Sequence, residues 1–213
     1  MERDIEKLES LLNAELPGLA AQLKMAPQFR KEELRNYKLE GKGKKSAVLI
    51  LFNPFAEDLS IILTKRSAHL KHHRGQVSFP GGRVDKADKD DISTALRETH
   101  EEIGINPEDI KVLGRLSRLI IPPTNFDVCP IVGILTKSPS YLLSLDEVES
   151  VVEVPIVQLL DKQNTKQKLF TTSSSGNHRK APYYDVMGLE IWGATAMIIS
   201  ELVEVLKKKL IVE

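Results

Sequence analysis

The segment from Asp91 to Ile103 constrains the fold of this chain most, because it is the clearest amphipathic helix in the sequence. One stripe along it is apolar or weakly polar at helical spacing and consists of Ile92, Leu96, Thr99 and Ile103. Gly104 follows as a stop signal, since glycine readily takes the left-handed conformation that ends many helices. We therefore expect a helix over residues 91–103 that packs against the rest of the chain by this stripe.

Short apolar runs before and after this helix predict β-strands, because aliphatic and β-branched residues between turn residues are typical of buried strands. These runs cover residues 47–52, 59–64, 112–116 and 128–135, and the Glu57-Asp58 turn between the first two suggests a hairpin. We also expect a short helix over 154–160, an exposed loop over 173–177 and a long helix over 191–210. Strands and helices mixed in this way indicate an α/β or α+β fold.

The length of 213 residues suits one sizeable domain with short terminal additions. From residue 5 to residue 23, aliphatic residues recur at roughly helical spacing, with Pro17 as an interruption. We expect residues 1–40 to form a helical N-terminal arm, kinked or broken near Pro17, and residues 41–213 to form the main domain.

Charge and cysteine content exclude several classes of function. The sequence has 30 Lys and Arg residues and 30 Asp and Glu residues, so no global field holds a polyanion, and we expect no stable nucleic acid binding. Cys129 is the only cysteine, which excludes an internal disulfide; it lies in a strand pattern, where we expect a buried, inert thiol. Without a signal peptide or a long apolar run, we expect a cytoplasmic protein with no membrane partner.

Three carboxylates share one side of the expected helix. At about 100° per residue, Glu98, Glu101 and Glu102 fall within an arc of roughly 100°, which we expect to lie away from the apolar stripe. Acidic residues on an outer helix face are often simply solvated. Hard divalent cations such as Mg²⁺, however, bind carboxylate oxygens together with water and phosphate oxygens. Gly81-Gly82, in a tight turn that would let a phosphate approach the backbone, favours phosphoryl transfer or diphosphate hydrolysis.

This combination resembles the Nudix hydrolase family, whose box reads G-x5-E-x7-R-E-U-x-E-E-x-G-U, where U is an aliphatic residue. The second half of the box is matched by Arg97, Glu98, Glu101, Glu102, Gly104 and Ile105, while Thr99 replaces an aliphatic residue. In the first half, Asp88 stands where a glutamate is expected after Gly82, and one extra residue precedes Arg97. The resemblance implies a Nudix α/β/α sandwich with a mixed β-sheet, in which the box forms a loop-helix-loop.

Upstream of the box the resemblance is more specific. Residues 62–82 look like the signature of the coenzyme A pyrophosphatase branch, L-L-T-x-R-S-x-x-L-x-x-x-x-G-x-x-x-F-P-G-G, with Ile62 in place of the first leucine. The likeness continues in residues 127–133, 146–148, 154–155 and 191–196. It implies hydrolysis of the diphosphate bond of coenzyme A, or of an acyl or oxidised derivative, to 3′,5′-ADP and a 4′-phosphopantetheine species.

The same resemblance implies roles for the box residues. Glu98 and Glu102, with Glu101 as a further ligand, would bind Mg²⁺ or Mn²⁺. A backbone carbonyl of Gly82 would be another ligand, and Arg97 would orient a box glutamate by ion pairing.

The general base and the substrate contacts come from the same comparison. The base is either Glu101 in the box or Glu147 in a distant loop, and we prefer Glu101 because it belongs to the box. Contacts with the substrate are implied for Arg66, Ser67, Lys71, Gly75 and Gln76.

Several alternatives stay open. His69, His72 and His73 have a spacing that could hold zinc on one helix face, although they lie inside the branch signature. The substrate could instead be a nucleoside triphosphate, ADP-ribose, NADH or capped RNA, or the chain could be a catalytically silent nucleotide-binding module. The arm could serve a partner interface, and a homodimer is one of the possible states.

Overall fold

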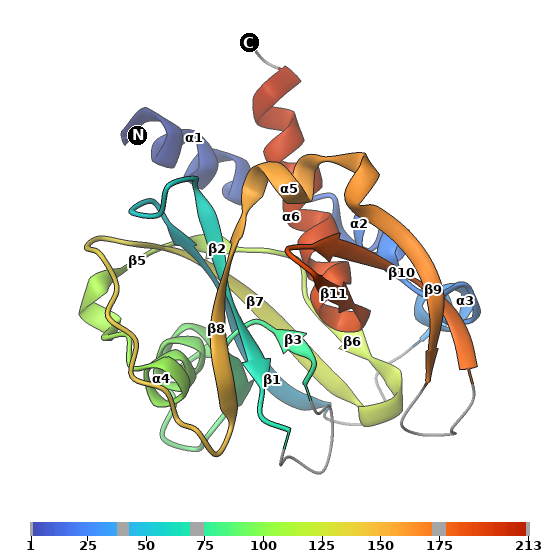
Figure 1. The fold of residues 1–213 in the computed structure, drawn as a ribbon, viewed down its shortest axis with the longest axis horizontal. Coiled ribbons are helices and arrows are strands. Elements are labelled where there is room, and N and C mark those ends of the chain that lie inside the picture. Colours follow the sequence, from blue (N-terminus) through green and yellow to red (C-terminus); the bar gives the residue numbers. More distant parts are fainter. Residues whose placement is uncertain (1, 38–42, 69–74, 172–177, 212–213) are drawn as a thin grey trace.

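A mixed β-sheet lies between two helical layers in the computed structural model, which describes residues 2–37, 43–68, 75–171 and 178–211 (Figure 1). The central sheet comprises β1 (Lys44–Asn53), β2 (Ser60–Arg66), β3 (Val77–Ser78), β4 (Gly81–Arg83), β5 (Ile110–Arg115), β6 (Leu119–Ile121), β7 (Phe126–Leu135) and β8 (Val148–Pro155). Its order is β3-β2-β1-β7-β5, with β4 paired to β1, β6 to β7 and β8 to β2. A second sheet contains β9 (Thr165–Thr171), β10 (His178–Val186) and β11 (Leu189–Trp192).

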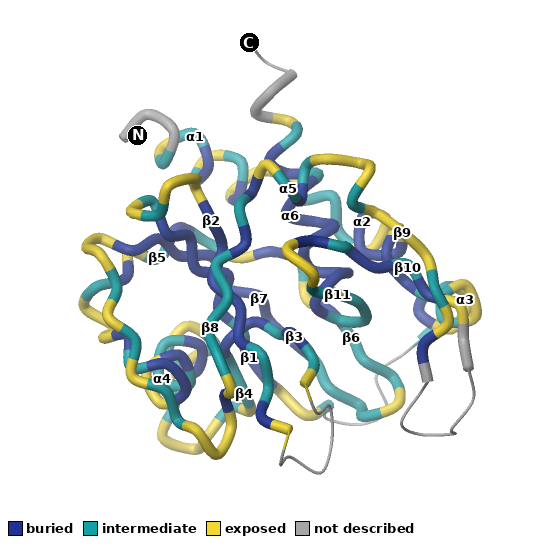
Figure 2. Tube along the Cα trace, in the orientation of Figure 1, coloured by how far each residue is buried: buried dark blue, intermediate teal, exposed yellow. Residues whose placement is uncertain are grey.

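Strand β1 runs through the middle of the central sheet and gives it its mixed character. It pairs in parallel with β7, from Lys44 opposite Phe126 onward, and antiparallel with β2. The predicted hairpin of the first two strands is therefore confirmed. Along β1, Leu49 and Leu51 belong to the apolar cluster on one face, whereas Ile50 belongs to the cluster on the other. All three are fully buried, as expected for a strand covered on both faces (Figure 2).

Different helices cover the two faces of the sheet. Helix α4 (Asp91–Ile103) packs on the face of Leu49 and Leu51, while α6 (Gly193–Ile211) packs on the opposite face (Figure 1). The other helices are α1 (Glu2–Asn13), α2 (Gly18–Gln22), α3 (Gln28–Asn36) and α5 (Ile156–Leu160). Single 3₁₀ turns cover Leu23–Met25, Pro107–Asp109, Pro122–Thr124 and Lys162–Asn164. This arrangement is the α/β/α sandwich expected from the sequence.

The N-terminal helices pack into the same apolar cluster as α6. Leu8, Leu12 and Leu23 are buried in it. Helix α1 ends at Asn13 and α2 begins at Gly18, which confirms the predicted break near Pro17. The expected boundary between arm and main domain, at residues 40 and 41, lies outside the described residues.

Two helix boundaries were wrong in the sequence-based prediction. Ile191 and Trp192 belong to strand β11, where Ile191 pairs with Tyr184, and the helix starts only at Gly193. Gly193 has a φ of 67°, which turns the chain sharply between strand and helix. Likewise, Val154 is a strand residue paired with Ile61, and helix α5 follows only after Pro155.

Two further expectations concern the surface. The predicted loop at 173–177 lies outside the described residues. The described chain ends with β9 before it and resumes with β10 after it. In the part that is described, no helix combines the length and the apolarity needed to cross a membrane.

Candidate functional site

Gly81 and Gly82 allow helix α4 to lie directly on strand β4. In the pairing of β4 with β1, Gly82 lies opposite Ala47. A Cβ atom at Gly81 would come within 2.4 Å of the Ala47 carbonyl oxygen, and one at Gly82 within 2.3 Å of Glu98 Oε2. A side chain at Gly81 would clash with the backbone of β1, and one at Gly82 would displace the Glu98 carboxylate, so the glycine pair lets that carboxylate lie against the backbone of β4.

Both ends of α4 are fixed by local caps. At the start, the Asp90 side chain accepts a hydrogen bond from the Ser93 N–H at 2.7 Å, and the Ser93 hydroxyl accepts one from the Asp90 N–H at 2.9 Å. At the end, Gly104 has a φ of 76° and its N–H donates to the His100 carbonyl. The helix bounds therefore agree with the predicted 91–103.

The buried side of α4 differs from the predicted stripe. Ile92 is exposed, while Ala95, Thr99, Glu102 and Ile103 are buried. Thr99 replaces the usual aliphatic residue without leaving an unpaired hydroxyl, because its Oγ1 donates to the Ala95 carbonyl at 2.7 Å.

Arg97 lies among three carboxylates. Its Nε and Nη2 each lie 2.9 Å from an oxygen of Asp88, and its Nη1 lies 2.9 Å from both Glu98 Oε1 and Glu101 Oε2. The guanidinium beside Asp88 holds the pKa of that carboxyl well below its usual range. Asp88, the residue that departs from the family box, is thus the bidentate partner of Arg97.

Asp88 is in turn held by its own surroundings. Its Oδ2 accepts hydrogen bonds from the Thr94 hydroxyl and from the Asp85 N–H, both at 2.8 Å. The longer loop between Gly82 and the helix therefore still delivers a carboxylate to Arg97. The spacing from Gly82 indicated that Asp88 stands at the acidic position of the box. Its contact with Arg97 is visible only in the fold.

The three box glutamates lie in three different environments. The Glu102 residue is only 4% exposed, whereas the Glu98 and Glu101 side chains are 17% and 57% exposed. The expectation that all three lie away from the buried stripe is wrong, because Glu102 is itself buried next to Ile103. Glu98 and Glu102 therefore lie inward, while Glu101 lies at the surface.

Burial destabilises the charged forms of the two inner glutamates. It raises the pKa of Glu102 to about 8, against the opposing effect of the Arg66 charge, with further increases from the charges of Glu147 and Glu98. Burial also raises the pKa of Glu98, although the neighbouring Arg97 acts in the opposite direction. Such a pair of carboxyls is suited to a nearby cation.

Two buried side-chain polar atoms in the described residues have no hydrogen-bond partner, and both belong to this site. They are Glu102 Oε2 and Arg66 Nε. A buried carboxylate oxygen without a partner fits a metal ligand, since hard cations take such oxygens. No three His, Cys, Asp or Glu side chains within the described ranges gather closely enough to enclose a metal ion by themselves. The residues therefore fit a divalent cation whose other ligands come from water and a phosphate substrate.

Glu147 joins the site from the loop before β8. Its charge raises the pKa of both Glu98 and Glu102, and its carbonyl accepts a hydrogen bond from the Ser67 N–H at 2.9 Å. The fold thus brings the distant candidate base close to the box.

Within the signature of residues 62–82, backbone hydrogen bonds join the two ends of the loop that leaves β2 at Arg66 and returns at Gly75. The Arg66 N–H donates to the Gln76 carbonyl at 3.0 Å, and the Gly75 N–H donates to the Arg66 carbonyl at 3.1 Å. With Ser67 bonded to Glu147, this loop begins at the edge of the site. Lys71 and the three histidines of the zinc alternative lie outside the described residues.

One part of the site gave no signal in the sequence. The Leu142 N–H donates to the Ile103 carbonyl and the Ser144 N–H donates to the Glu102 carbonyl, both at 3.0 Å. These backbone bonds fasten the loop that carries Glu147 to the last turn of α4. Backbone groups have no sequence signature, so only the fold reveals this connection.

Comparison with known proteins agrees with this geometry. The model of the NUDIX domain matches residues 43–172. The uncharacterized Nudix hydrolase NudL of Cronobacter sakazakii is 40% identical over 146 residues, which cover 67% of this chain and 72% of that protein. The solved MutT protein of Methanosarcina mazei has a TM-score of 0.51 at 20% identity, over 80% of this chain and 99% of that one. The NUDIX domain of Shewanella oneidensis NrtR, solved with ADP ribose, has a TM-score of 0.50 at 18% identity, over 84% and 97%. At these identities the two structures show the shared fold.

Proposed function

The chain belongs to the Nudix family, and on that premise we propose that it hydrolyses the diphosphate bond of coenzyme A or of an acyl or oxidised derivative. The products are 3′,5′-ADP and a 4′-phosphopantetheine species. Action on a nucleoside diphosphate derivative is the coarser part of this function and follows from the family. Coenzyme A as the substrate is the finer part and needs its own test.

The observation that carries the proposal is the pair of unpartnered buried atoms. Glu102 Oε2 is an acceptor without a hydrogen-bond donor, and Arg66 Nε is a donor without an acceptor. The charge of Arg66 lowers the pKa of Glu102, so the two groups are neighbours. A diphosphate that carries a divalent cation provides a partner for both atoms, because it presents positive charge to the carboxylate and anionic oxygens to the guanidinium.

Glu98 and Glu102 would hold Mg²⁺ or Mn²⁺, with a backbone carbonyl of Gly82 as a further ligand. The cation, when bound, would neutralise diphosphate oxygens and polarise a phosphorus atom for attack by water. Arg97 keeps Glu98 in place through its ion pair, while Asp88 keeps Arg97 in place.

Glu147 and Glu101 are both candidates for the base that accepts a proton from the attacking water. Both residues are exposed, but Glu101 is bound to Arg97, whereas the charge of Glu147 acts on both inner glutamates. A base must be free to reach the attacking water, so the ion pair that holds Glu101 on Arg97 favours Glu147. We expect Glu147→Gln to lower kcat more than Glu101→Gln, with KM little changed in both variants.

The coenzyme A assignment is supported by the signature residues at the edge of the site. The charge of Arg66 acts on Glu102, and the Ser67 N–H is bonded to the backbone of Glu147, so the signature loop starts where the rest of a substrate would extend beyond its diphosphate. Contacts of Ser67, Gly75 and Gln76 with the substrate are part of the proposal.

The test is a chromatographic analysis of products. Purified protein is incubated with MgCl₂ and, in separate reactions, with coenzyme A, ADP-ribose, NADH, ATP and capped RNA. We expect 3′,5′-ADP from coenzyme A far faster than any other product. Glu102→Gln should slow this reaction by about 100-fold or more. The matched control is Glu190→Gln, an exposed glutamate that pairs with Lys168 in the second sheet.

Each other result has a distinct meaning. Faster cleavage of another substrate would keep the Nudix chemistry and refute coenzyme A as the preferred substrate. Absence of turnover with both Mg²⁺ and Mn²⁺, together with nucleotide binding, would identify a catalytically silent module.

A further inference from the structure

The segment from residue 138 to residue 145 has an unusual surface. It reads Ser-Pro-Ser-Tyr-Leu-Leu-Ser-Leu and contains no charged residue, in a chain of which 28% is charged. Leu142 is 77% exposed and Leu145 is 72% exposed. We refer to these two residues as the leucine ledge. Single exposed leucines are common, so their significance depends on whether the backbone beneath them is fixed and where it lies.

The ledge is fixed to the end of helix α4. The backbone bonds from Leu142 to Ile103 and from Ser144 to Glu102 hold it on one side. Gly104 permits this close packing, because a Cβ there would come within 2.6 Å of the Leu142 Cβ. The two exposed leucines therefore stand on ordered backbone.

Tyr141 fixes the same segment to the sheet. Its hydroxyl donates to Glu153 Oε1 at 2.6 Å, and Glu153 Oε2 accepts a second hydrogen bond from Asn53 Nδ2 at 2.8 Å. Both carboxylate oxygens of Glu153 are thereby paired in a half-buried position. The ledge is thus held from the sheet as well as from the helix.

One end of the ledge adjoins the proposed metal site. Leu145 lies between Ser144, which is bonded to the Glu102 backbone, and Glu147, whose charge acts on the Glu98 and Glu102 carboxyls. Along this loop from Glu147, a ligand with its diphosphate on Glu98 and Glu102 would reach Leu145 after the exposed Asp146.

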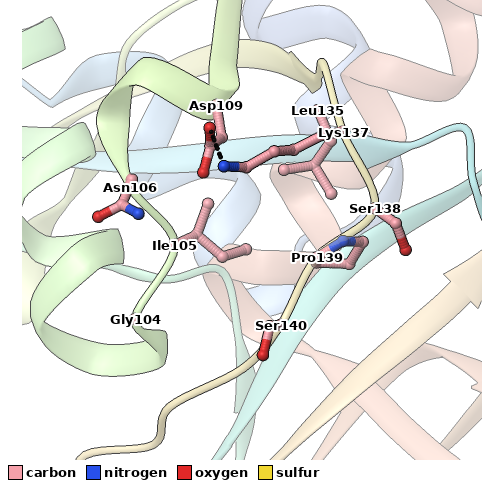
Figure 3. A pocket seen from close by; sticks show the side chains of 9 residues that line it. All are labelled: Gly104, Ile105, Asn106, Asp109, Leu135, Lys137, Ser138, Pro139 and Ser140. Atoms are coloured by element: carbon pink, nitrogen blue, oxygen red, sulfur yellow. Dashed lines mark ion pairs between the residues drawn. The ribbon is translucent and has the colours of Figure 1, made fainter.

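The other end of the ledge adjoins a cavity of about 130 Å³. In Figure 3, residues 138–140 face residues 104–106 across this cavity, and the ion pair of Asp109 with Lys137, at 2.8 Å, closes one end. Gly104 lines the cavity and also contacts Leu142. Side chains of Asn106, Ser138 and Ser140 provide uncharged polar groups in it. The surface is therefore charged at the metal site and apolar at the ledge, while the cavity has uncharged polar groups with the Asp109–Lys137 ion pair at one end.

We propose that Leu142 and Leu145 bind the uncharged arm of the substrate, the chain of alkyl and amide groups attached to the diphosphate on the side opposite the nucleoside. This inference rests on the proposed function, since coenzyme A is a substrate with such an arm. Along this surface, charged, apolar and polar regions follow one another. Along coenzyme A, the diphosphate is followed by alkyl groups and then by amide groups, so the two orders match. An uncharged loop suits an uncharged arm, because no charge has to lose its water when the arm binds.

The test uses the double substitution Leu142→Ser and Leu145→Ser in the full chain. Both side chains are exposed, so the fold should tolerate the change. We expect KM for coenzyme A to rise about tenfold and kcat to stay within about twofold. The inhibition constant of 3′,5′-ADP, which lacks the arm, should not change. Leu169→Ser is the matched control, because Leu169 is 64% exposed on β9 of the second sheet.

A second measurement does not depend on hydrolysis. Pantetheine, the arm without phosphate or nucleoside, is mixed with the protein and followed by saturation-transfer NMR. We expect transfer with the wild-type chain and with Leu169→Ser, and its loss in the double variant. If this pattern is found but coenzyme A is not hydrolysed, the ledge proposal stands and the proposed function fails.

Two results would overturn the ledge proposal while leaving the proposed function intact. One is an unchanged KM for coenzyme A in the double variant, with equal pantetheine signals. The other is a wild-type dimer that the double variant converts to monomers without a change in KM, as measured by sedimentation velocity. In that case the leucines would bind a second copy of the chain.

Discussion

Asp88 binds Arg97 through both carboxylate oxygens, at 2.9 Å from Nε and 2.9 Å from Nη2. The remaining guanidinium nitrogen, Nη1, is then directed to Glu98, the next residue, and to Glu101, one turn further along the helix. A rigid planar guanidinium held on one edge presents its other edge in a fixed direction. Asp88 therefore influences the position of Glu98 through the guanidinium that both carboxylates share.

Replacing Asp88 by Asn should lower activity by way of Glu98. The amide keeps the shape of the side chain but provides one good acceptor instead of two, so Arg97 loses part of its anchor. We expect kcat to fall by about tenfold or more, as for other residues that orient metal ligands. Steady-state kinetics with the preferred substrate measure this. Asp185→Asn is the control, since Asp185 belongs to an exposed ion pair with Lys166. Equal activity of the two variants would show that Asp88 has no positioning role.

The same ion pair predicts how stability depends on pH. Arg97 lowers the pKa of Asp88 in the folded chain, relative to an ordinary value of 3.8. Its contribution to the free energy of unfolding is therefore complete above about pH 4 and is lost as the pH falls through the lower folded pKa. We expect wild type to exceed Asp88→Asn in stability at neutral pH and the difference to shrink below about pH 4. Urea unfolding at both pH values tests this; a constant difference would contradict it.

Local signals predicted the element at the centre of the site. The bounds of α4 were correct because both caps depend on adjacent residues, Asp90 with Ser93 at the start and Gly104 at the end. Strands β1 and β7 were found because strands buried on both faces are apolar without interruption.

Other features depend on contacts between distant segments and had no local signal. Strand β9 carries Lys166 and Lys168 among its first residues, so it has no apolar run. Ile191 and Trp192 continue the apolar pattern of the helix that follows, and periodicity alone could not separate strand from helix. The approach of Glu147 to the box depends on the pairing of β8 with β2, which spacing along the sequence does not reveal.

The N-terminal arm should be needed for stability. Glu201 in α6 is fully buried, and its carboxylate accepts hydrogen bonds from Gln22 Nε2 at 2.8 Å, the Gly18 N–H at 3.0 Å and the Ser117 N–H at 3.3 Å. Gln22→Ala removes one of these donors from a buried charge. We expect the free energy of unfolding to fall by about 2 kcal/mol. Thermal or urea unfolding measures this, with the exposed Gln167→Ala as control.

A stronger form of this test removes residues 1–37. The buried carboxylate of Glu201 then loses both donors of the arm, and we expect a much lower melting temperature. A truncated chain with wild-type stability and activity would instead indicate that the arm serves a separate partner interface.

Cys129 should be unreactive in the folded chain. It is fully buried, and burial raises the pKa of its thiol to about 11, with a smaller contribution from the charge of Asp91. At pH 8 only about one thiol in a thousand would be ionised. We expect no measurable alkylation by iodoacetamide, followed by mass spectrometry, and complete reaction in guanidinium chloride. Rapid alkylation of the folded chain would show that this strand opens readily.

Gly82→Ala tests whether close contact between β4 and the helix sets the geometry of the site. The new methyl group would lie 2.3 Å from Glu98 Oε2 and would displace that carboxylate, while the three closest atoms it meets all belong to Glu98. We expect activity to fall by about 100-fold, because catalysis is sensitive to shifts of about 1 Å, while the melting temperature changes little. Gly188→Ala is the control for activity alone, since a Cβ there meets nothing within 4 Å, whereas its φ of 73° strains an alanine and lowers the melting temperature. Kinetics and thermal unfolding are measured on both variants. Wild-type activity of Gly82→Ala would mean that Glu98 does not need this position, and Glu102 would then remain as the inner box glutamate on which metal binding depends.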